Sequence, residues 1–366
     1  MTYSVNFANY TIGKEAYKNV NEVCRQYGTK ALLIGGKLAL EAGKEKLLQA
    51  LAEGENPVTI VDTVLFGEDC TYAGMEKIAA HVKKCGADMI FGMGGGKALD
   101  TAKGTAEKCA LPVFTFPTIA ATCAATTALS VVYKEDGNFD SFYFYEKPAR
   151  HSFIDTEIIA AAPECYLRAG IGDTLGKYFE CHFSARGDRL THSSALGREI
   201  SNMCYLPLRE YAESALEECR ENQAGEALEQ AVLANIVSTG LVSLLVLDDY
   251  NGAIAHSVYY GLVLLPGFEE KNLHGDVVAY GVLVQLMIDG EEEKAREMKG
   301  FLEKLGIRTT LAEMGAPLER EALTAVLKEI VTGPDMEHIP YEVTEDMVYN
   351  ALCKVEELQS IKGAAE

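Results

Sequence analysis

The chain has 366 residues, enough for two domains or one large one. Hydrophobic residues make up 48% and charged residues 24%, ordinary values for a globular protein that exclude disordered, collagen-like and fibrous classes. The 54 acidic residues against 33 basic ones give a net charge of −21, which repels nucleic acids and anionic membrane surfaces, so neither is expected as a partner.

From residue 30 to about residue 155, short apolar runs alternate with helical patterns, as in βαβ units on a parallel sheet. Strands are predicted at 31–34, 58–65, 89–91 and 113–116, with helices near 38–51, 73–84 and 98–108 between them. Further strands are predicted at 129–133, 142–145 and 152–154. The first two of these are joined by the turn sequence at 135–138, which predicts a hairpin appended to the sheet.

From Pro163 onward, apolar residues recur at three- and four-residue spacing in long segments. We therefore expect an all-helical second half, in which the charged run at 291–294 is a solvated helix start. The predicted fold class is an α/β domain over residues 1–162, followed by an all-α domain over residues 163–366.

The segment 91–103, FGMGGGKALDTAK, is a predicted strand that runs into a glycine cluster and then a helix. Glycines let backbone amides approach a phosphate closely, and a helix N-terminus carries about half a positive charge. The GxGxxG fingerprint would need Gly at Lys97, and the P-loop pattern would need Gly at Phe91 and a hydroxyl at Ala98. The segment is therefore a pyrophosphate-binding turn outside both motifs or a tight turn without ligand; the entropy cost of three successive glycines favours the first.

A second cofactor-facing candidate follows the first predicted strand, in the sequence Ile34-Gly35-Gly36-Lys37. Dinucleotide enzymes often place an acidic residue near this point, on the adenine ribose. Here Gly36 is followed by Lys37, so a positive charge replaces the negative one. We predict that these residues contact the cofactor and that NADP(H) is used at least as well as NAD(H). The alternative is that Lys37 is a solvated residue at a helix start.

Three separated residues suggest a metal site. His256 lies in an apolar helical stretch, His274 begins another, and Asp173 lies at an expected helix start in weakly polar company. A buried carboxylate is costly unless it is paired or bound to metal. Two imidazole nitrogens and one carboxylate oxygen suit Zn²⁺ and leave an open position, as in catalytic sites. The alternative is an N-cap Asp with two unrelated His.

The ten cysteines are scattered, with no CxxC pair, which is typical of reduced thiols in a cytoplasmic protein. The first twenty residues lack a charged region followed by an apolar one, and no uninterrupted apolar run reaches about 18 residues. We therefore expect neither an export signal nor a membrane span.

These motifs together resemble the metal-dependent, so-called iron-containing alcohol dehydrogenases, and within them the glycerol dehydrogenase branch. The resemblance extends from about residue 30 to residue 289. It rests on GGGK at 94–97 with Asp100 and Lys103, PTIAAT at 117–122, LSVVY at 129–133, GIGD at 170–173, Ala255-His256 and His274-Gly275.

The resemblance implies a Rossmann-like N-terminal domain and a helical C-terminal domain, the architecture of dehydroquinate synthase, with cofactor and metal in the cleft between them. It implies that Asp173, His256 and His274 hold the metal. It also implies that Gly94, Gly95, Gly96 and Lys97 hold the pyrophosphate of NAD or NADP, that Asp100 belongs to the cofactor motif, and that Thr118, Thr122, Leu129, Val131 and Tyr133 line the cofactor channel. By analogy with the family we expect a homo-oligomer.

The departures from the family pattern are informative. Iron-binding relatives carry a fourth ligand, a His one turn after the Asp, where this chain has Lys177. Zinc is thus favoured over Fe²⁺. Glycerol dehydrogenases carry a substrate-binding Asp where this chain has Cys123, and an aromatic residue where it has Leu247. These two differences argue against glycerol itself.

Cys123, the Gly36-Lys37 pair and Lys177 instead resemble the hydroxycarboxylate dehydrogenases, which reduce small 2-oxo acids. Lys177 lies four residues after Asp173 on the same helix face, where it could attract a substrate carboxylate; the alternative is an ion pair with Asp173 or with solvent. The acidic stretch 247–251 before His256 would repel a dicarboxylate. The predicted substrate is therefore a small alcohol, a diol or a monocarboxylic 2-oxo or 2-hydroxy acid.

The predicted activity is hydride transfer between NAD(P) and this substrate at a metal-polarised oxygen. One alternative is a sugar-phosphate cyclase like dehydroquinate synthase, which uses NAD transiently. Such an enzyme needs clustered Lys or Arg residues for a substrate phosphate, and Lys177 is nearly alone. A noncatalytic nucleotide-binding scaffold is the third possibility.

Overall fold

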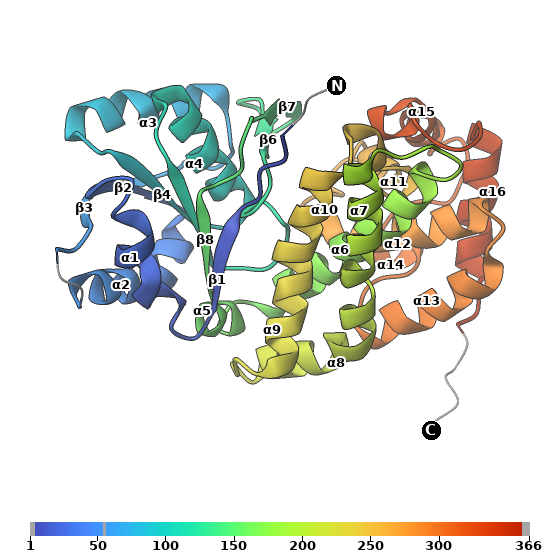
Figure 1. Ribbon diagram of the computed structural model, residues 1–366. Helices are drawn as coiled ribbons and strands as arrows, with labels where there is room; N and C mark the ends of the chain where they lie inside the picture. Colours follow the sequence, from blue (N-terminus) through green and yellow to red (C-terminus); the bar gives the residue numbers. More distant parts are fainter. Residues whose placement is uncertain (1–3, 54–55, 361–366) are drawn as a thin grey trace.

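The chain folds into an α/β part followed by an all-helical part, and the two lie side by side in Figure 1. The computed structural model describes residues 4–53 and 56–360. The last strand comes directly before α5 (Thr156–Ala160), and α6 (Glu164–Ser184) begins the helical part. The predicted fold class, α/β then all-α, is confirmed.

A six-stranded parallel sheet forms the centre of the α/β part, with strand order β1-β8-β5-β4-β2-β3. Its strands are β1 (Asn9–Gly13), β2 (Lys30–Gly35), β3 (Thr59–Leu65), β4 (Met89–Gly94), β5 (Val113–Pro117) and β8 (His151–Asp155). All six residues of β4 are buried, and β2 is buried beyond Lys30. Parallel strands covered on both faces require such continuous apolar runs.

Two features of this part differ from the prediction. The strand β1 was not predicted; it lies at the edge of the sheet, and its residues are exposed or half-buried, so it gives no apolar run. The hairpin of β6 (Leu129–Tyr133) and β7 (Phe139–Phe144) is a separate two-stranded sheet rather than an extension of the main one. Only β8 of the late strands enters the main sheet, between β1 and β5.

The helices between strands were located from sequence to within about two residues. They are α2 (Lys37–Ala52), α3 (Tyr72–Cys85) and α4 (Gly96–Cys109). Local signals explain their ends: the Thr71 hydroxyl accepts the Gly74 N–H at the start of α3, and Gly86 at its end has a positive φ of 68°. A short α1 (Val20–Cys24) precedes β2.

Beyond residue 163 the described chain contains helices and connecting turns, as predicted. The longer helices are α6, α7 (His192–Ile200), α8 (Leu206–Arg220), α9 (Glu226–Val232), α10 (Thr239–Leu245), α11 (Ile254–Leu262), α12 (His274–Ile288), α13 (Glu292–Lys304), α15 (Thr324–Thr332) and α16 (Glu345–Glu357). Most of α12 is buried on all sides, which makes it the central helix of this part.

One helical run in the described residues, Glu226–Leu245, is long and apolar enough to cross a membrane by length and composition. It comprises α9, a π-helical stretch at Leu233–Ser238 and α10. Because 61% of its most apolar window is buried inside the protein, this run is explained as a core helix.

Candidate metal and cofactor site

Glycines bring α6 and α12 into close contact. A Cβ atom on Gly172 would lie 2.2 Å from the backbone oxygen of Gly275, and one on Gly275 would lie 1.7 Å from that of Ala169. Only glycine permits this approach, because any side chain would push the helices apart. Asp173 follows Gly172 and His274 precedes Gly275, so the helix contact also brings their side chains together.

The position of Asp173 corrects the prediction that it starts a helix. It lies in the middle of α6. The nearby Gly170 and Gly172 do not end the helix; they lie where other backbone segments approach it closely. The alternative of an N-cap Asp is therefore wrong. Asp173 is 8% exposed. A carboxylate buried in a helix interior must be satisfied by a charge partner or a ligand.

The imidazole of His256 reaches the same point from α11. Helix α11 approaches α12 closely at Gly281, where a Cβ atom would lie 2.4 Å from the backbone oxygen of Ala255. His256 is the third residue of α11, and its ring lies 5.4 Å from that of His274, centroid to centroid. Three helices thus contribute one polar side chain each to one point.

The geometry of this group fits a divalent ion. Asp173 Oδ1 lies 3.4 Å from Nε2 of His256 and 3.4 Å from Nε2 of His274, and the three donor atoms lie within 4.8 Å of one another. A tetrahedral zinc ion with bonds of about 2.0 Å separates its ligand atoms by roughly 3.3 Å. The donor set therefore has the chemistry and nearly the spacing of a three-residue zinc site.

A buried acid that the sequence analysis did not identify holds His256. Glu180 lies two turns beyond Asp173 on α6, and its side chain is fully buried. Its Oε2 lies 2.5 Å from Nδ1 of His256, while its Oε1 accepts the backbone N–H groups of His256 and Ala253 at 2.8 and 2.9 Å. The seven-residue spacing from Asp173, which returns to the same helix face, was the available signal.

The charges of this cluster shift the pKa values of His256, Asp173 and Glu180 against the effect of burial. Burial alone would lower the pKa of His256, but Glu180 and Asp173 outweigh it and raise the pKa to about 10. Burial would likewise raise the pKa of Asp173, but His256 and His274 hold it well below its usual value. The same imidazole lowers the pKa of Glu180 against the effect of burial. The site is thus built to hold positive charge between carboxylates.

Lys177 lies between Asp173 and Glu180 on α6, but it contacts neither Asp173 nor open solvent. Its Nζ donates to the backbone oxygen of Asn251 at 2.5 Å and to its Oδ1 at 3.1 Å, and the residue is 8% exposed. Lys177 therefore fixes the segment that leads into α11. The exposed side chains of Asp248 and Asp249 belong to the same segment.

Cys123 lies in the segment 118–128 that connects β5 to β6. This segment is docked on the helical part, since Asn235 Nδ2 donates to the backbone oxygen of Ala120 and the Thr126 hydroxyl donates to that of Ile236. Cys123 is half-buried, and burial together with the negative charge of Asp173 raises the pKa of its thiol to about 12. At neutral pH it is a protonated thiol close to the three-residue group.

Close packing explains two of the glycines in the turn between β4 and α4. Gly94 has a positive φ of 148°, and a Cβ atom there would lie 2.8 Å from that of Ala98. A Cβ atom on Gly95 would lie 2.7 Å from Cδ1 of Ile119. Gly95 is the N-cap residue of α4 and Gly96 its first residue, so no side chain of the N-cap residue binds the first amides, and a helix start of this kind can bind an anion. Steric fit and anion binding are thus compatible explanations of the same cluster.

The remaining predicted cofactor residues surround this turn. Lys97 forms an ion pair with Asp69, and its Nζ lies 4.7 Å above the ring of Tyr133. The backbone N–H of Thr118 donates to the oxygen of Gly94 at 3.2 Å. In β6, Leu129, Val131 and Tyr133 are half-buried while the alternate residues are buried, so the three predicted channel residues share one face. Thr122 is half-buried, and its hydroxyl lies 3.3 Å from a Cβ position on Gly96.

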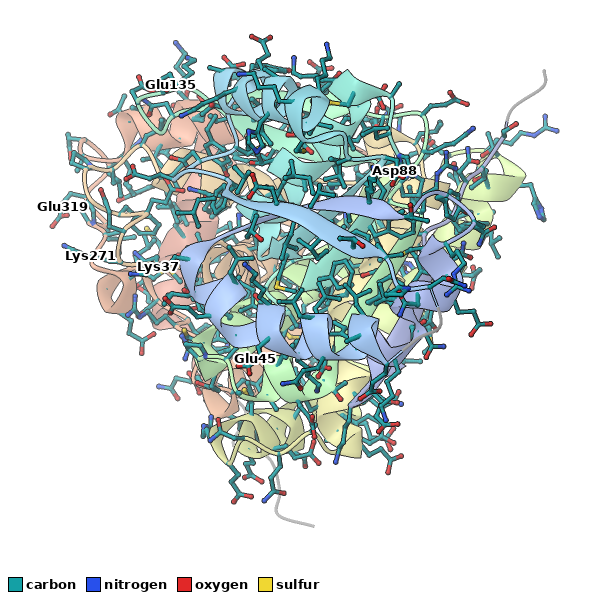
Figure 2. The ribbon with its side chains drawn as sticks, turned by 90° about the vertical axis from the view of Figure 1, so that its left-hand side faces the viewer. Lys37, Glu45, Asp88, Glu135, Lys271 and Glu319 are labelled. Carbon is teal, nitrogen blue, oxygen red and sulfur yellow. The ribbon has the colours of Figure 1, made fainter. Side chains whose placement is uncertain are left out.

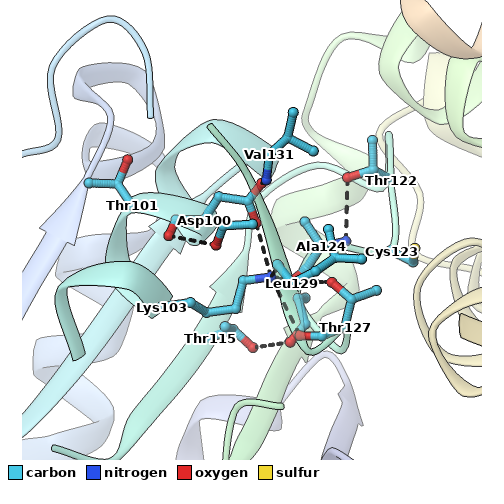
Figure 3. Close-up of polar contacts among 12 residues, drawn as sticks. Asp100, Thr101, Lys103, Thr115, Thr122, Cys123, Ala124, Thr127, Leu129 and Val131 are labelled. Carbon is cyan, nitrogen blue, oxygen red and sulfur yellow. Dashed lines mark hydrogen bonds and ion pairs between the residues drawn. The ribbon is translucent and has the colours of Figure 1, made fainter. Parts of the chain in front are cut away.

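Asp100 and Lys103 differ from these residues because they are buried. Figure 3 shows Lys103 pointing from α4 toward the segment that leads into β6, where its Nζ donates to the oxygens of Ala124 and Leu129. The same Nζ lies 2.9 Å from Asp100 Oδ1, and Asp100 Oδ2 accepts the N–H of Val131 at 3.0 Å. The ion pair of Asp100 and Lys103 therefore connects β6, which carries the predicted channel residues, to α4.

Lys37 is exposed at the first turn of α2. In the view of Figure 2 it points outward at the side of the molecule where Lys271 and Glu319 are also labelled, away from Asp88. Gly36 is the N-cap residue of α2, and a Cβ atom there would lie 3.3 Å from the ring of Phe66. Lys37 forms no ion pair within the described residues. Its ammonium group is therefore available to contact a phosphate group of a ligand.

A sequence model described as iron-containing alcohol dehydrogenase matches residues 8–156 of the chain. The chain is 30% identical to glycolaldehyde reductase of Halobacterium salinarum, over 96% of each chain, and 34% identical to glycerol dehydrogenase of Thermotoga maritima, over 80% of each. It is 33% identical to hydroxycarboxylate dehydrogenase A of Escherichia coli, over 91% of each.

The fold is also that of a solved relative. The crystal structure of glycerol dehydrogenase from Schizosaccharomyces pombe superposes with a TM-score of 0.86 at 28% identity, covering 98% of this chain and 91% of that one. This likeness extends over both parts of the chain.

Proposed function

The chain belongs to the iron-containing alcohol dehydrogenase family, and on that premise we propose that it is a zinc-dependent dehydrogenase of small vicinal diols, with 2-hydroxy acids as the second substrate class. As a family member it is an NAD(P)-linked oxidoreductase of alcohols or hydroxy acids that uses a divalent metal. The cyclase alternative is not favoured, because these relatives are named dehydrogenases and reductases. The same names argue against a noncatalytic scaffold.

The convergence of Asp173, His256 and His274 carries the proposal that these residues hold the metal. Bound there, zinc would act as a Lewis acid on the substrate oxygen. Lys177 takes the place of a fourth protein ligand, and its ammonium group binds Asn251 instead of a metal ion. Three protein ligands of this kind suit catalytic zinc, and we infer zinc rather than Fe²⁺ for this reason.

We propose that the cofactor lies along the glycine turn and the exposed face of β6. The amides at the start of α4, which the N-cap residue does not cap, would bind the pyrophosphate, with Lys97 beside them. Lys37 supplies a positive charge near the expected adenine ribose, which supports use of NADP(H) at least as well as NAD(H). Leu129, Val131 and Tyr133 would face the cofactor, and the buried Asp100 would position them.

The contacts of Lys177 favour a neutral diol over a hydroxy acid. A substrate carboxylate would have to compete with the two oxygens of Asn251 for its ammonium group. Cys123, a neutral thiol, stands where glycerol dehydrogenases place a carboxylate, which argues against glycerol itself. A hydroxycarboxylate dehydrogenase activity is kept as the second candidate because Lys177 lies one helical turn from Asp173.

The test is a screen of small alcohols, diols and 2-oxo acids with NAD(H) and NADP(H) on zinc-loaded protein. The variant Lys177→Met then separates the two substrate classes, because the ratio of kcat/KM for a diol to that for a hydroxy acid is independent of the folded fraction. We expect this ratio to stay within about threefold if diols are the substrates. A tenfold rise, about 1.4 kcal/mol, would show that Lys177 binds a carboxylate.

We also propose that the domains divide at residues 162/163, that the enzyme is cytoplasmic and that it forms a homo-oligomer. The change from strands to helices next to residue 163 supports the division. Ten cysteines without a disulfide in the described residues support a reducing compartment. Size-exclusion chromatography with light scattering tests the oligomeric state.

A further inference from the structure

Helix α11 begins without a side-chain cap of its own. Its N-cap residue is Ala253, and the side chain of Ala253 cannot accept a hydrogen bond. The first N–H groups of a helix need acceptors, and the start of α11 is buried. Glu180 supplies the acceptor from a different helix, since its Oε1 binds the N–H groups of both Ala253 and His256.

The second oxygen of the same carboxylate faces the ring of His256. With Oε1 committed to two backbone donors, Oε2 is left for Nδ1, 2.5 Å away. Glu180 is fully buried, and its Oε1 already accepts two backbone N–H groups, so its carboxyl group faces the ring of His256 as a hydrogen-bond acceptor. Nδ1 of His256 must therefore carry a proton.

A neutral imidazole has one proton, and the tautomer follows from its position. If Nδ1 is protonated, the lone pair lies on Nε2, which is the nitrogen 3.4 Å from Asp173 Oδ1. We propose that Glu180 is a positioning residue that fixes His256 in the tautomer and ring orientation required for binding a divalent metal through Nε2. This inference rests on the proposed metal site and adds a residue that does not itself bind the metal.

The isosteric change Glu180→Gln tests the proton argument rather than the packing. A glutamine can keep its oxygen toward the two backbone donors, but its NH₂ group then faces Nδ1 of His256. That group donates, so the imidazole proton must move to Nε2, where it blocks metal binding. Loss of such a supporting contact typically weakens metal binding by about 10- to 100-fold.

We expect Glu180→Gln to weaken Zn²⁺ binding by at least tenfold, measured by competition with a chromophoric chelator at fixed pH. The absorption bands of the Co²⁺-substituted protein should change as well. The helical circular dichroism signal should match that of wild type. The affinity for NADH should stay within about twofold of the wild-type value. Glu180→Asp, which retains an accepting carboxylate, should recover part of the zinc affinity. The matched control is Glu164→Gln on the same helix, where the acid pairs with Arg168 and Arg220, and it should leave zinc binding unchanged.

Zinc affinity of Glu180→Gln within threefold of wild type would overturn the inference. His256→Ala distinguishes that result from failure of the metal site itself, because retention of full zinc affinity in His256→Ala would overturn the proposed function instead. If Glu180→Gln does not fold, ¹⁵N NMR of imidazole-labelled, zinc-loaded wild type decides the matter. A proton on Nδ1 of His256 supports the inference, and a proton on Nε2 contradicts it.

Discussion

Lys103 is predicted to hold the cofactor-facing segment in place, and Lys103→Met tests this role. The side chain of Lys103 is 2% exposed and that of its partner Asp100 is 7% exposed. Methionine keeps the length of the apolar stem but removes the ammonium group. The carbonyl groups of Ala124 and Leu129 then lose this donor, and Asp100 is left as a buried charge that still accepts the N–H of Val131.

The magnitude follows from this geometry. Removing one partner of a buried ion pair costs about 3–5 kcal/mol, because the other charge remains buried without compensation. Burial already raises the pKa of Asp100 against the effect of Lys103, so the unpaired acid would take up a proton in preference to staying charged. That response should hold the loss near the lower end, about 3 kcal/mol. The double variant Asp100→Asn/Lys103→Met removes both charges and should recover about 1–2 kcal/mol of it.

The assay is urea unfolding followed by far-UV circular dichroism, because the chain has no Trp to report by fluorescence. Binding of NADH is measured in parallel. We expect Lys103→Met to lower the free energy of unfolding by about 3 kcal/mol and to weaken NADH binding more than tenfold. A loss below about 1 kcal/mol with unchanged NADH affinity would refute the reasoning that this pair holds the β6 segment against α4.

Three further predictions concern other parts of the molecule. Gly275→Ala should cost about 1–3 kcal/mol of stability in urea unfolding and weaken zinc binding, because its methyl group would meet the backbone oxygen of Ala169 and move His274; unchanged zinc affinity would contradict this. Burial lowers the pKa of His151 to about 4. Below about pH 6.5 the unfolded chain therefore binds a proton at this residue that the folded chain does not bind. The free energy of unfolding should decrease by about 3 kcal/mol as the pH falls from 6.5 to 4. His151→Gln should remove most of that dependence in unfolding curves measured across this range, and a variant curve parallel to wild type would refute the assignment. Lys37→Asp should shift the ratio of kcat/KM for NADP(H) to that for NAD(H) in favour of NAD(H). A wild-type preference for NAD(H) above tenfold, about 1.4 kcal/mol, would contradict the cofactor prediction.

The elements of the α/β part could be located from the sequence where burial makes the pattern simple. Strand β4 is buried along its whole length and has an apolar sequence that ends in glycines, so its start and the following turn into a helix were predicted, although the strand continues three residues beyond the predicted end at residue 91. Strand β1 could not be found this way, because an edge strand with exposed residues has no such run. Pairing in the sheet depends on long-range contacts, which is why β8, and not the hairpin, proved to extend it.

The error at Asp173 arose because glycine has two structural uses. Gly170 and Gly172 suggest a loop before a helix when only the sequence is considered, since glycine is a poor helix former. In the structure they lie inside α6 and permit contact with the segment 118–128 and with α12. Local propensity was overridden by packing between distant segments.

The convergence of Asp173, His256 and His274 was an expectation strengthened by a family resemblance, because spacing along the chain does not specify how three helices meet. The supporting role of Glu180 was missed for a related reason. Its three donors come from the start of α11, more than seventy positions further along the chain. Only the fold brings that helix start beside α6.

The most direct test of the whole account is anomalous diffraction at the zinc absorption edge from crystals of the zinc-loaded protein. We predict one strong peak about 2.0–2.2 Å from a carboxylate oxygen of Asp173 and from Nε2 of both His256 and His274. An absence of density there, or a zinc ion bound by other residues, would contradict it.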